Sequence, residues 1–90
     1  MHKWMFLTNH TLILLCIAQD PGMRLREMAG QVGITERAAQ RIVAELESGG
    51  YISREKSGRR NVYHIFKEQP LRHPLAQSSQ VGALIEALGR

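Results

Sequence analysis

The chain has 90 residues, and its 12 Lys and Arg residues exceed its 8 Asp and Glu residues by four. A chain of this length forms one domain with a thin core, because it buries only on the order of 60% of the surface that its unfolded form exposes. Its single cysteine, Cys16, excludes an internal disulfide framework and is typical of a reducing compartment.

A first helix is predicted over residues 8–19, with Thr8 as its N-cap and the turn sequence "DPG" after its end. The run Leu12–Ala18 places apolar groups on every side of this helix, so the helix must be covered all round, by the chain itself or by a partner. The same run is far below the ~20 residues of a membrane span, and no small-residue cleavage site follows it. We therefore expect a cytoplasmic protein.

Two amphipathic helices are predicted next, separated by a tight turn at Gly33. Their apolar residues recur at i, i+3, i+4 and i+7; they are Leu25, Met28, Ala29 and Val32, then Ala39, Ile42, Val43 and Leu46. Thr35 can cap the later helix, and Glu36 adds a negative charge at the positive end of its dipole. The face opposite its apolar stripe carries two arginines, a glutamine and small residues.

Two strand-like runs, "YISREK" and "NVYHIF", follow a double glycine and are joined through residues 57–59. The charge excess of the chain lies in residues 53–67, because the charges before and after this segment cancel. Five basic residues face only Glu55 there; they are Arg54, Lys56, Arg59, Arg60 and Lys67. A charge excess confined to one place attracts a polyanion, although a solvated loop is the alternative for such a cluster considered alone.

The C-terminal part is predicted to hold a linker and a last helix. Two prolines in residues 68–77 indicate an extended connection. Ser78 or Ser79 can cap an amphipathic helix within residues 78–90, and the apolar residues of that helix are Val81, Leu84, Ile85 and Leu88.

These predicted elements stand in the order of a winged helix-turn-helix. The stretch "LREMAGQVGITERAAQRIVAELESGGYISR" resembles the DNA-reading unit of small MarR- and ArsR-type bacterial and archaeal regulators. The resemblance is carried by Ala29, "VGIT" at the turn, "QR" in the third helix, Leu46 and "GGYI", and "GRRNVYHI" resembles the return strand of the wing. It implies a mainly α, single-domain winged helix-turn-helix with a small β-hairpin over residues 1–67, followed here by an extra C-terminal helix.

The same resemblance implies a sequence-specific, double-stranded DNA-binding transcriptional regulator. Its third helix would enter the major groove, and its basic wing would lie on the phosphates or in the minor groove. The implied DNA-binding residues are Thr35, Glu36, Arg37, Gln40 and Arg41 in the helix and Arg54, Lys56, Arg59 and Arg60 in the wing. Arginine and glutamine suit this task because they bond bidentately to guanine and adenine. Two alternatives stay open. Glu36 could only help to cap the helix, and Arg37 and Arg41 could belong to an exposed helix face on which Arg41 pairs with Glu45.

The first helix, the apolar residues before it and the last helix predict a twofold homodimer with a shared apolar layer. The alternative is that the last helix folds back to complete its own core. The expected interface residues are Trp4, Phe6, Ile13, Ile17, Val81, Leu84, Ile85 and Leu88. Two reading helices about 34 to 36 Å apart would meet successive major grooves, so the DNA site should be an imperfect palindrome.

Other classes of function receive little support from the sequence. We expect no enzyme, because no nucleophile motif, paired acidic residues or glycine-rich phosphate loop is present. We expect no metal or cofactor, because the four histidines lack i, i+3 or i, i+4 pairing and Cys16 is apolar in its setting. An effector ligand is not identified. The competing function is a winged helix that binds a protein partner without specific DNA binding.

Overall fold

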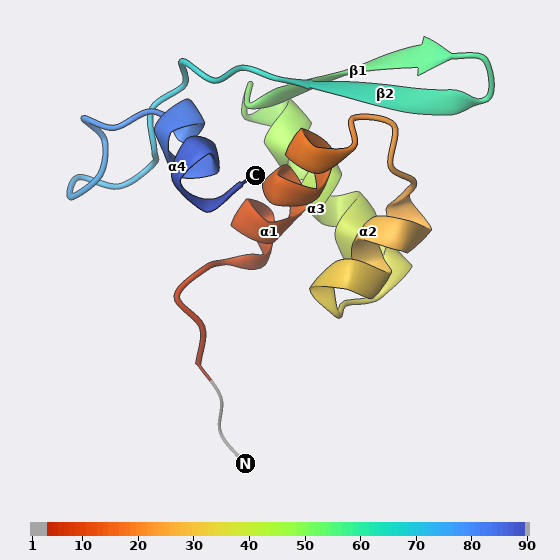
Figure 1. Cartoon of the computed structure of the whole chain (residues 1–90), viewed down its shortest axis with the longest axis horizontal. Helices are drawn as coiled ribbons and strands as arrows, with labels where there is room; N and C mark the ends of the chain where they lie inside the picture. Colours follow the sequence, from red (N-terminus) through yellow and green to blue (C-terminus); the bar gives the residue numbers. More distant parts are fainter. Residues whose placement is uncertain (1–3, 90) are drawn as a thin grey trace.

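The structure is a computed structural model and describes residues 4–89. Its elements are, in chain order, α1 (Asn9–Gln19), α2 (Leu25–Val32), α3 (Glu36–Ser48), β1 (Ile52–Ser57), β2 (Arg60–Ile65) and α4 (Val81–Leu88). Helix α1 lies between α2 and α4, and the β1–β2 hairpin runs along one edge of the helices (Figure 1). The predicted mainly α fold with one β-hairpin is thereby confirmed.

Helix α1 is the centre of the core. It begins after Thr8, whose hydroxyl oxygen accepts a hydrogen bond from the amide of Thr11 at 3.3 Å, as the sequence predicts. Its Ile13 and Ile17 are fully buried, and the helix contacts α2, α3, β2 and α4. The chain itself therefore supplies most of the cover that an all-apolar helix needs. Among residues 4–89, no helix has both the length and the apolar composition needed to cross a bilayer.

Helices α2 and α3 are joined by a tight turn at Gly33. Its φ of 88° lies in the left-handed region, where a side chain would be strained and glycine is not. The amides of Gly33 and Ile34 both donate to the carbonyl of Ala29, at 2.8 and 3.0 Å, which closes the end of α2. The predicted stripe of α3 is buried against the core, so the opposite face of α3 is left exposed.

The hairpin is antiparallel, with Ile52 paired to Ile65 at its base and Ser57 paired to Arg60 at its tip. The turn therefore has two residues, Gly58 and Arg59, and Gly58 takes the positive φ of 66° that such turns require. The amide of Tyr63 donates to the carbonyl of Pro21 at 2.9 Å, which ties β2 to the turn between α1 and α2. The wing is thus held beside the start of α2.

The start of α4 differs from the sequence prediction. Neither Ser78 nor Ser79 caps this helix; Gln80 is the N-cap and makes no side-chain hydrogen bond. Instead, the amide of Val81 donates to the carbonyl of Gln69 at 2.8 Å, and the next amide donates to Lys67 at 2.9 Å. The serine prediction is wrong because backbone carbonyls distant in sequence already satisfy the free amides.

Helix α4 folds back onto α1, and Val81 and Ile85 are buried there. The connection before it is not extended throughout, because the amide of Ala76 bonds to His73 and that of Ser79 bonds to Ala76 in hydrogen-bonded turns. Each proline restricts the residue before it to an extended backbone, whereas the other residues of the connection can form turns.

The side chains expected at an interface between two copies fall into two groups. Four lie in the protomer's own core; they are Ile13, Ile17, Val81 and Ile85. In this conformation they have no surface to offer to a second copy. This narrows the expected interface to Trp4, Phe6 and Leu88, which are exposed, and Leu84, which is partly exposed.

Candidate nucleic-acid interface

The exposed face of α3 carries the residues predicted to read DNA. Thr35 caps the helix, since its hydroxyl oxygen accepts a hydrogen bond from the amide of Ala38 at 3.0 Å. The apolar stripe of α3 is buried in the core, so the opposite side of the helix faces solvent. The five α3 residues predicted to bind DNA are all exposed there; they are Thr35, Glu36, Arg37, Gln40 and Arg41.

Four of these five residues surround one shallow hollow of about 500 Å³. The side chains that line it are Thr35, Arg37, Ala38, Gln40, Arg41 and Ala44. Its two alanines leave room for a close approach, and its arginines and glutamine have the donors that bind base edges. We call the surface formed by these six lining residues the reading face. Glu36 does not line it and borders a second hollow beside the wing.

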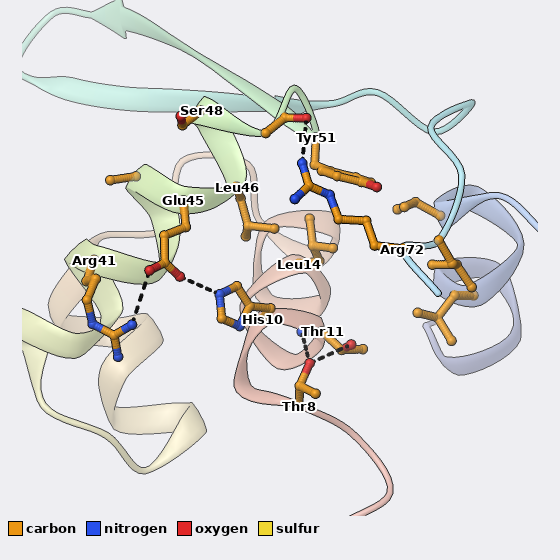
Figure 2. A pocket seen from close by; sticks show the side chains of 15 residues that line it. Thr8, His10, Thr11, Leu14, Arg41, Glu45, Leu46, Ser48, Tyr51 and Arg72 are labelled. Carbon is orange, nitrogen blue, oxygen red and sulfur yellow. Dashed lines mark hydrogen bonds and ion pairs between the residues drawn. The ribbon is translucent and has the colours of Figure 1, made fainter. Parts of the chain in front are cut away.

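Arg41 takes part in a chain of polar side-chain contacts at the edge of the reading face (Figure 2). Its guanidinium lies 3.3 Å from Oε2 of Glu45, and Oε1 of Glu45 lies 2.7 Å from Nε2 of His10. The hydrogen bond with His10, followed by the charge of Arg41, lowers the pKa of the Glu45 carboxyl below its ordinary value. The i, i+4 pair that the sequence offered as an alternative is therefore formed, but it is exposed and weak enough to yield to a base.

The four predicted wing residues are exposed, but they do not form one cluster. Arg54 turns toward α3 and lies 3.5 Å from Oε1 of Glu47. Lys56 shares the same face of β1, two residues nearer the tip. Arg59 and Arg60 stand at the tip and border the hollow beside α2. The wing therefore offers positive charge at two places.

The second hollow, of about 740 Å³, lies between the wing tip and the start of α2. Four arginines and two carboxylates border it; they are Arg24, Arg26, Arg59, Arg60, Glu27 and Glu36. Glu27 is partly engaged, because its Oε1 accepts a hydrogen bond from the amide of Arg24 at 3.1 Å. We call this second hollow the basic hollow. Its four arginines outnumber its two carboxylates, and the resulting net positive charge suits a phosphate.

Sequence reasoning missed Arg24 and Arg26. Counted by segment, their charges cancel against acidic residues of the same half of the chain. The contact of Tyr63 with Pro21 brings the wing to them, and that contact joins residues 42 positions apart. The sequence feature that could have indicated them is a pair of arginines, two positions apart, at the start of a predicted helix.

Within residues 4–89, no three His, Cys, Asp or Glu side chains gather closely enough to hold a metal ion. Cys16 is buried in the core, where its thiol lies 3.8 Å from Oε1 of Gln31. Burial raises the pKa of this thiol, which disfavours the reactive thiolate.

A helix pair joined by a tight glycine turn, an exposed polar face on the second helix of the pair and a basic hairpin after it define the winged helix-turn-helix class. The sequence model of a family described as winged helix-turn-helix DNA-binding matches residues 7–53, which is more than half of the chain. The chain belongs to this family, whose members bind DNA and are typically not enzymes. No curated protein matches the chain.

Proposed function

We propose that this protein is a transcriptional regulator that binds specific sequences of double-stranded DNA, in the manner of MarR- and ArsR-type regulators. The observation that carries the proposal is the reading face, where Arg37, Gln40 and Arg41 border one hollow with two small alanines. In this proposal the first half of α3 lies in the major groove and these side chains bond to base edges.

The wing and the start of α2 would hold the phosphates. The basic hollow places four arginines around one concave surface, and the exposed Arg54 and Lys56 extend the positive charge along β1. Contacts of this kind fix the position of the protein on the duplex without reading sequence, although an arginine in a narrow minor groove would favour A·T-rich flanks.

Three further properties belong to the same proposal. We propose a cytoplasmic protein without catalytic activity, acting as a homodimer on an imperfect palindrome. A dimer would present two reading faces to successive major grooves on one side of the duplex.

Selection of bound sequences from a random pool of double-stranded DNA tests the proposal. We expect enrichment of one motif with two related half-sites. The double variant Arg37→Ala/Arg41→Ala is the control, and it should bind DNA at low salt but enrich no motif. Absence of enrichment with the unchanged protein would contradict sequence-specific binding and favour a winged helix that binds a protein partner.

A further inference from the structure

The turn that joins α3 to β1 is held from outside by the segment that follows the wing. This turn begins with two glycines, and glycine has more backbone freedom than any other residue. The side-chain amide of Gln69 donates a hydrogen bond to the carbonyl of Gly50 at 3.1 Å. The guanidinium of Arg72 donates one to the carbonyl of Gly49 at 3.4 Å. We call residues 49–51 the α3–β1 link and these two side chains the link clamp.

Tyr51, the last residue of the link, is held by the same segment. Its hydroxyl donates a hydrogen bond to the carbonyl of Pro70, and the guanidinium of Arg72 lies 5.2 Å from the centre of its ring, as in a cation–π contact. Figure 2 shows this guanidinium beside the ring. A Cβ on Gly49 would lie 2.6 Å from Nη2 of Arg72, so only a glycine leaves the guanidinium its place. Residues 69–72 thus contact every residue of the link.

The segment that carries the link clamp is itself anchored to the core. The carbonyl of Gln69 accepts a hydrogen bond from the amide of Val81 at 2.8 Å, and the amide of Leu71 donates to the carbonyl of Ser79 at 3.0 Å. Leu71 packs against the core cluster, and α4 packs against α1. The α3–β1 link is therefore tied to the core through this segment as well as along the chain.

The wing has a second attachment on its other strand, where the amide of Tyr63 donates to the carbonyl of Pro21 at 2.9 Å. Ile52 and Ile65 are buried beneath the base of the hairpin, but apolar packing is non-directional, so the two hydrogen-bonded attachments set its angle. A hairpin attached only at Tyr63 can pivot there. Its tip lies roughly 10 Å further along the strand, so a pivot of about 15° would move the tip by roughly 3 Å and break a phosphate contact.

We propose that Gln69 and Arg72 are positioning residues for DNA binding, which fix the angle of the wing so that the reading face and the basic hollow meet one duplex together. This role rests on the proposed function, in which α3 and the wing tip both contact DNA. Two linked binding surfaces reinforce each other only when their linkage lets both engage at once. Neither residue of the link clamp borders the reading face or the basic hollow, so neither needs to touch DNA itself.

Hydrogen exchange of the free protein tests the link clamp without DNA. The clamp variant Gln69→Ala/Arg72→Ala should speed the exchange of the amides of residues 50 and 51 roughly tenfold, as expected when hydrogen bonds are lost from a local opening. The amides of α1 should keep their rates, because Arg72 is exposed at the surface. Unchanged exchange in the link, or an equal rise throughout the core, would overturn the proposal.

Lys67→Ala is the matched control for the clamp variant. It removes one positive charge from the same connection, but Lys67 borders a hollow with Gln80 and Glu86 and lies outside the link clamp. We expect it to leave the exchange of both the link and α1 unchanged.

A double-mutant cycle between the link clamp and the wing tip tests the positioning role on DNA. Arg60 stands at the tip, and the affinity losses caused by changes at such separate sites normally multiply. Because the clamp variant has already lost part of the phosphate contact, Arg60→Ala should lower its DNA affinity by a factor roughly threefold smaller than in the unchanged protein. With Lys67→Ala in place of the clamp variant, the losses should simply multiply. Losses that multiply with the clamp variant too would overturn the proposal.

Failure of the positioning role and failure of the proposed function give different results. A motif that is enriched by the unchanged protein, together with multiplying losses in the cycle, would keep the proposed function and reject the role of the link clamp. If no motif is enriched, sequence-specific binding is contradicted. The cycle is then measured on random duplex DNA at low salt and still decides on the link clamp, because phosphate contacts do not depend on sequence.

Discussion

His10 near the start of α1 and Glu45 in the second half of α3 lie 2.7 Å apart, between Nε2 of the imidazole and Oε1 of the carboxylate. The other carboxylate oxygen accepts a hydrogen bond from Arg41 at 3.3 Å. One exposed carboxylate thus links the central helix of the core to a residue of the reading face.

The change His10→Ala should raise the pKa of Glu45 toward its ordinary value of 4.5, because the hydrogen bond with His10 is the largest cause of its lowering. A lowered folded-state pKa adds stability above the unfolded-state pKa, and this stability is lost as pH falls through the folded-state pKa. The unchanged protein should therefore be more stable than the His10→Ala variant near neutral pH. This difference in stability should vanish in the acid range, below pH 4.5. NMR titration of the Glu45 carboxyl measures the pKa directly, and Arg41→Ala should raise it as well, because the charge and the hydrogen bond of Arg41 also lower it.

The change Arg41→Ala should weaken binding to the selected motif by about 1 to 3 kcal/mol, the discrimination that one good bidentate contact provides. Its effect on random DNA should be much smaller, because the residue borders the reading face and not the basic hollow. Fluorescence anisotropy on both DNAs at one salt concentration measures the ratio. Equal losses on the two DNAs would show that Arg41 does not read bases.

The basic hollow predicts a different result for its arginines. Arg26→Ala and Arg60→Ala should each lower affinity on every sequence and reduce the slope of log affinity against log salt by about one, as expected for loss of a phosphate contact. Titrations across a range of salt concentrations give the slope.

Lys67→Gln is the matched control for these arginines. Lys67 belongs to the same basic segment of the sequence, but the structure places it against α4, where it borders a separate hollow with Gln80 and Glu86. Its removal should leave the salt slope unchanged. A slope that falls equally in all three variants would show that binding depends on net charge and not on the position of the arginines.

Two helical glycines should respond to alanine with opposite signs. At Gly82 in α4, a Cβ would lie 2.9 Å from Cβ and 3.1 Å from the carbonyl oxygen of Lys67, so Gly82→Ala should destabilise the protein by about 1 to 3 kcal/mol. At Gly30 in α2, no atom lies within 4 Å of the added Cβ, so Gly30→Ala should stabilise it by about 0.5 to 1 kcal/mol. Urea unfolding measures both. A neutral Gly82→Ala would show that α4 shifts without cost and is not fixed on its connection.

Much of the fold followed from local signals. Thr8 and Thr35 cap helices as predicted, Gly33 takes the left-handed turn between two helices, and Gly58 lies in the turn of the wing. Each of these depends on residues within about four positions, because caps, turns and the helical period are set by neighbours along the chain. The local sequence signals therefore predicted the order of the helices and the hairpin, and also which face of α3 is exposed.

The sequence by itself thus determined the helix-turn-helix and the basic hairpin after it. Only the tertiary structure decided that α4 folds back on α1, that Glu36 leaves the reading face, that Arg24 and Arg26 join the wing tip and that Lys67 does not. These outcomes rest on contacts between segments far apart in the chain, such as Tyr63 with Pro21 and Val81 with Gln69. Such contacts form where packing and backbone hydrogen bonds are best satisfied, and no local pattern of residue types encodes those distances.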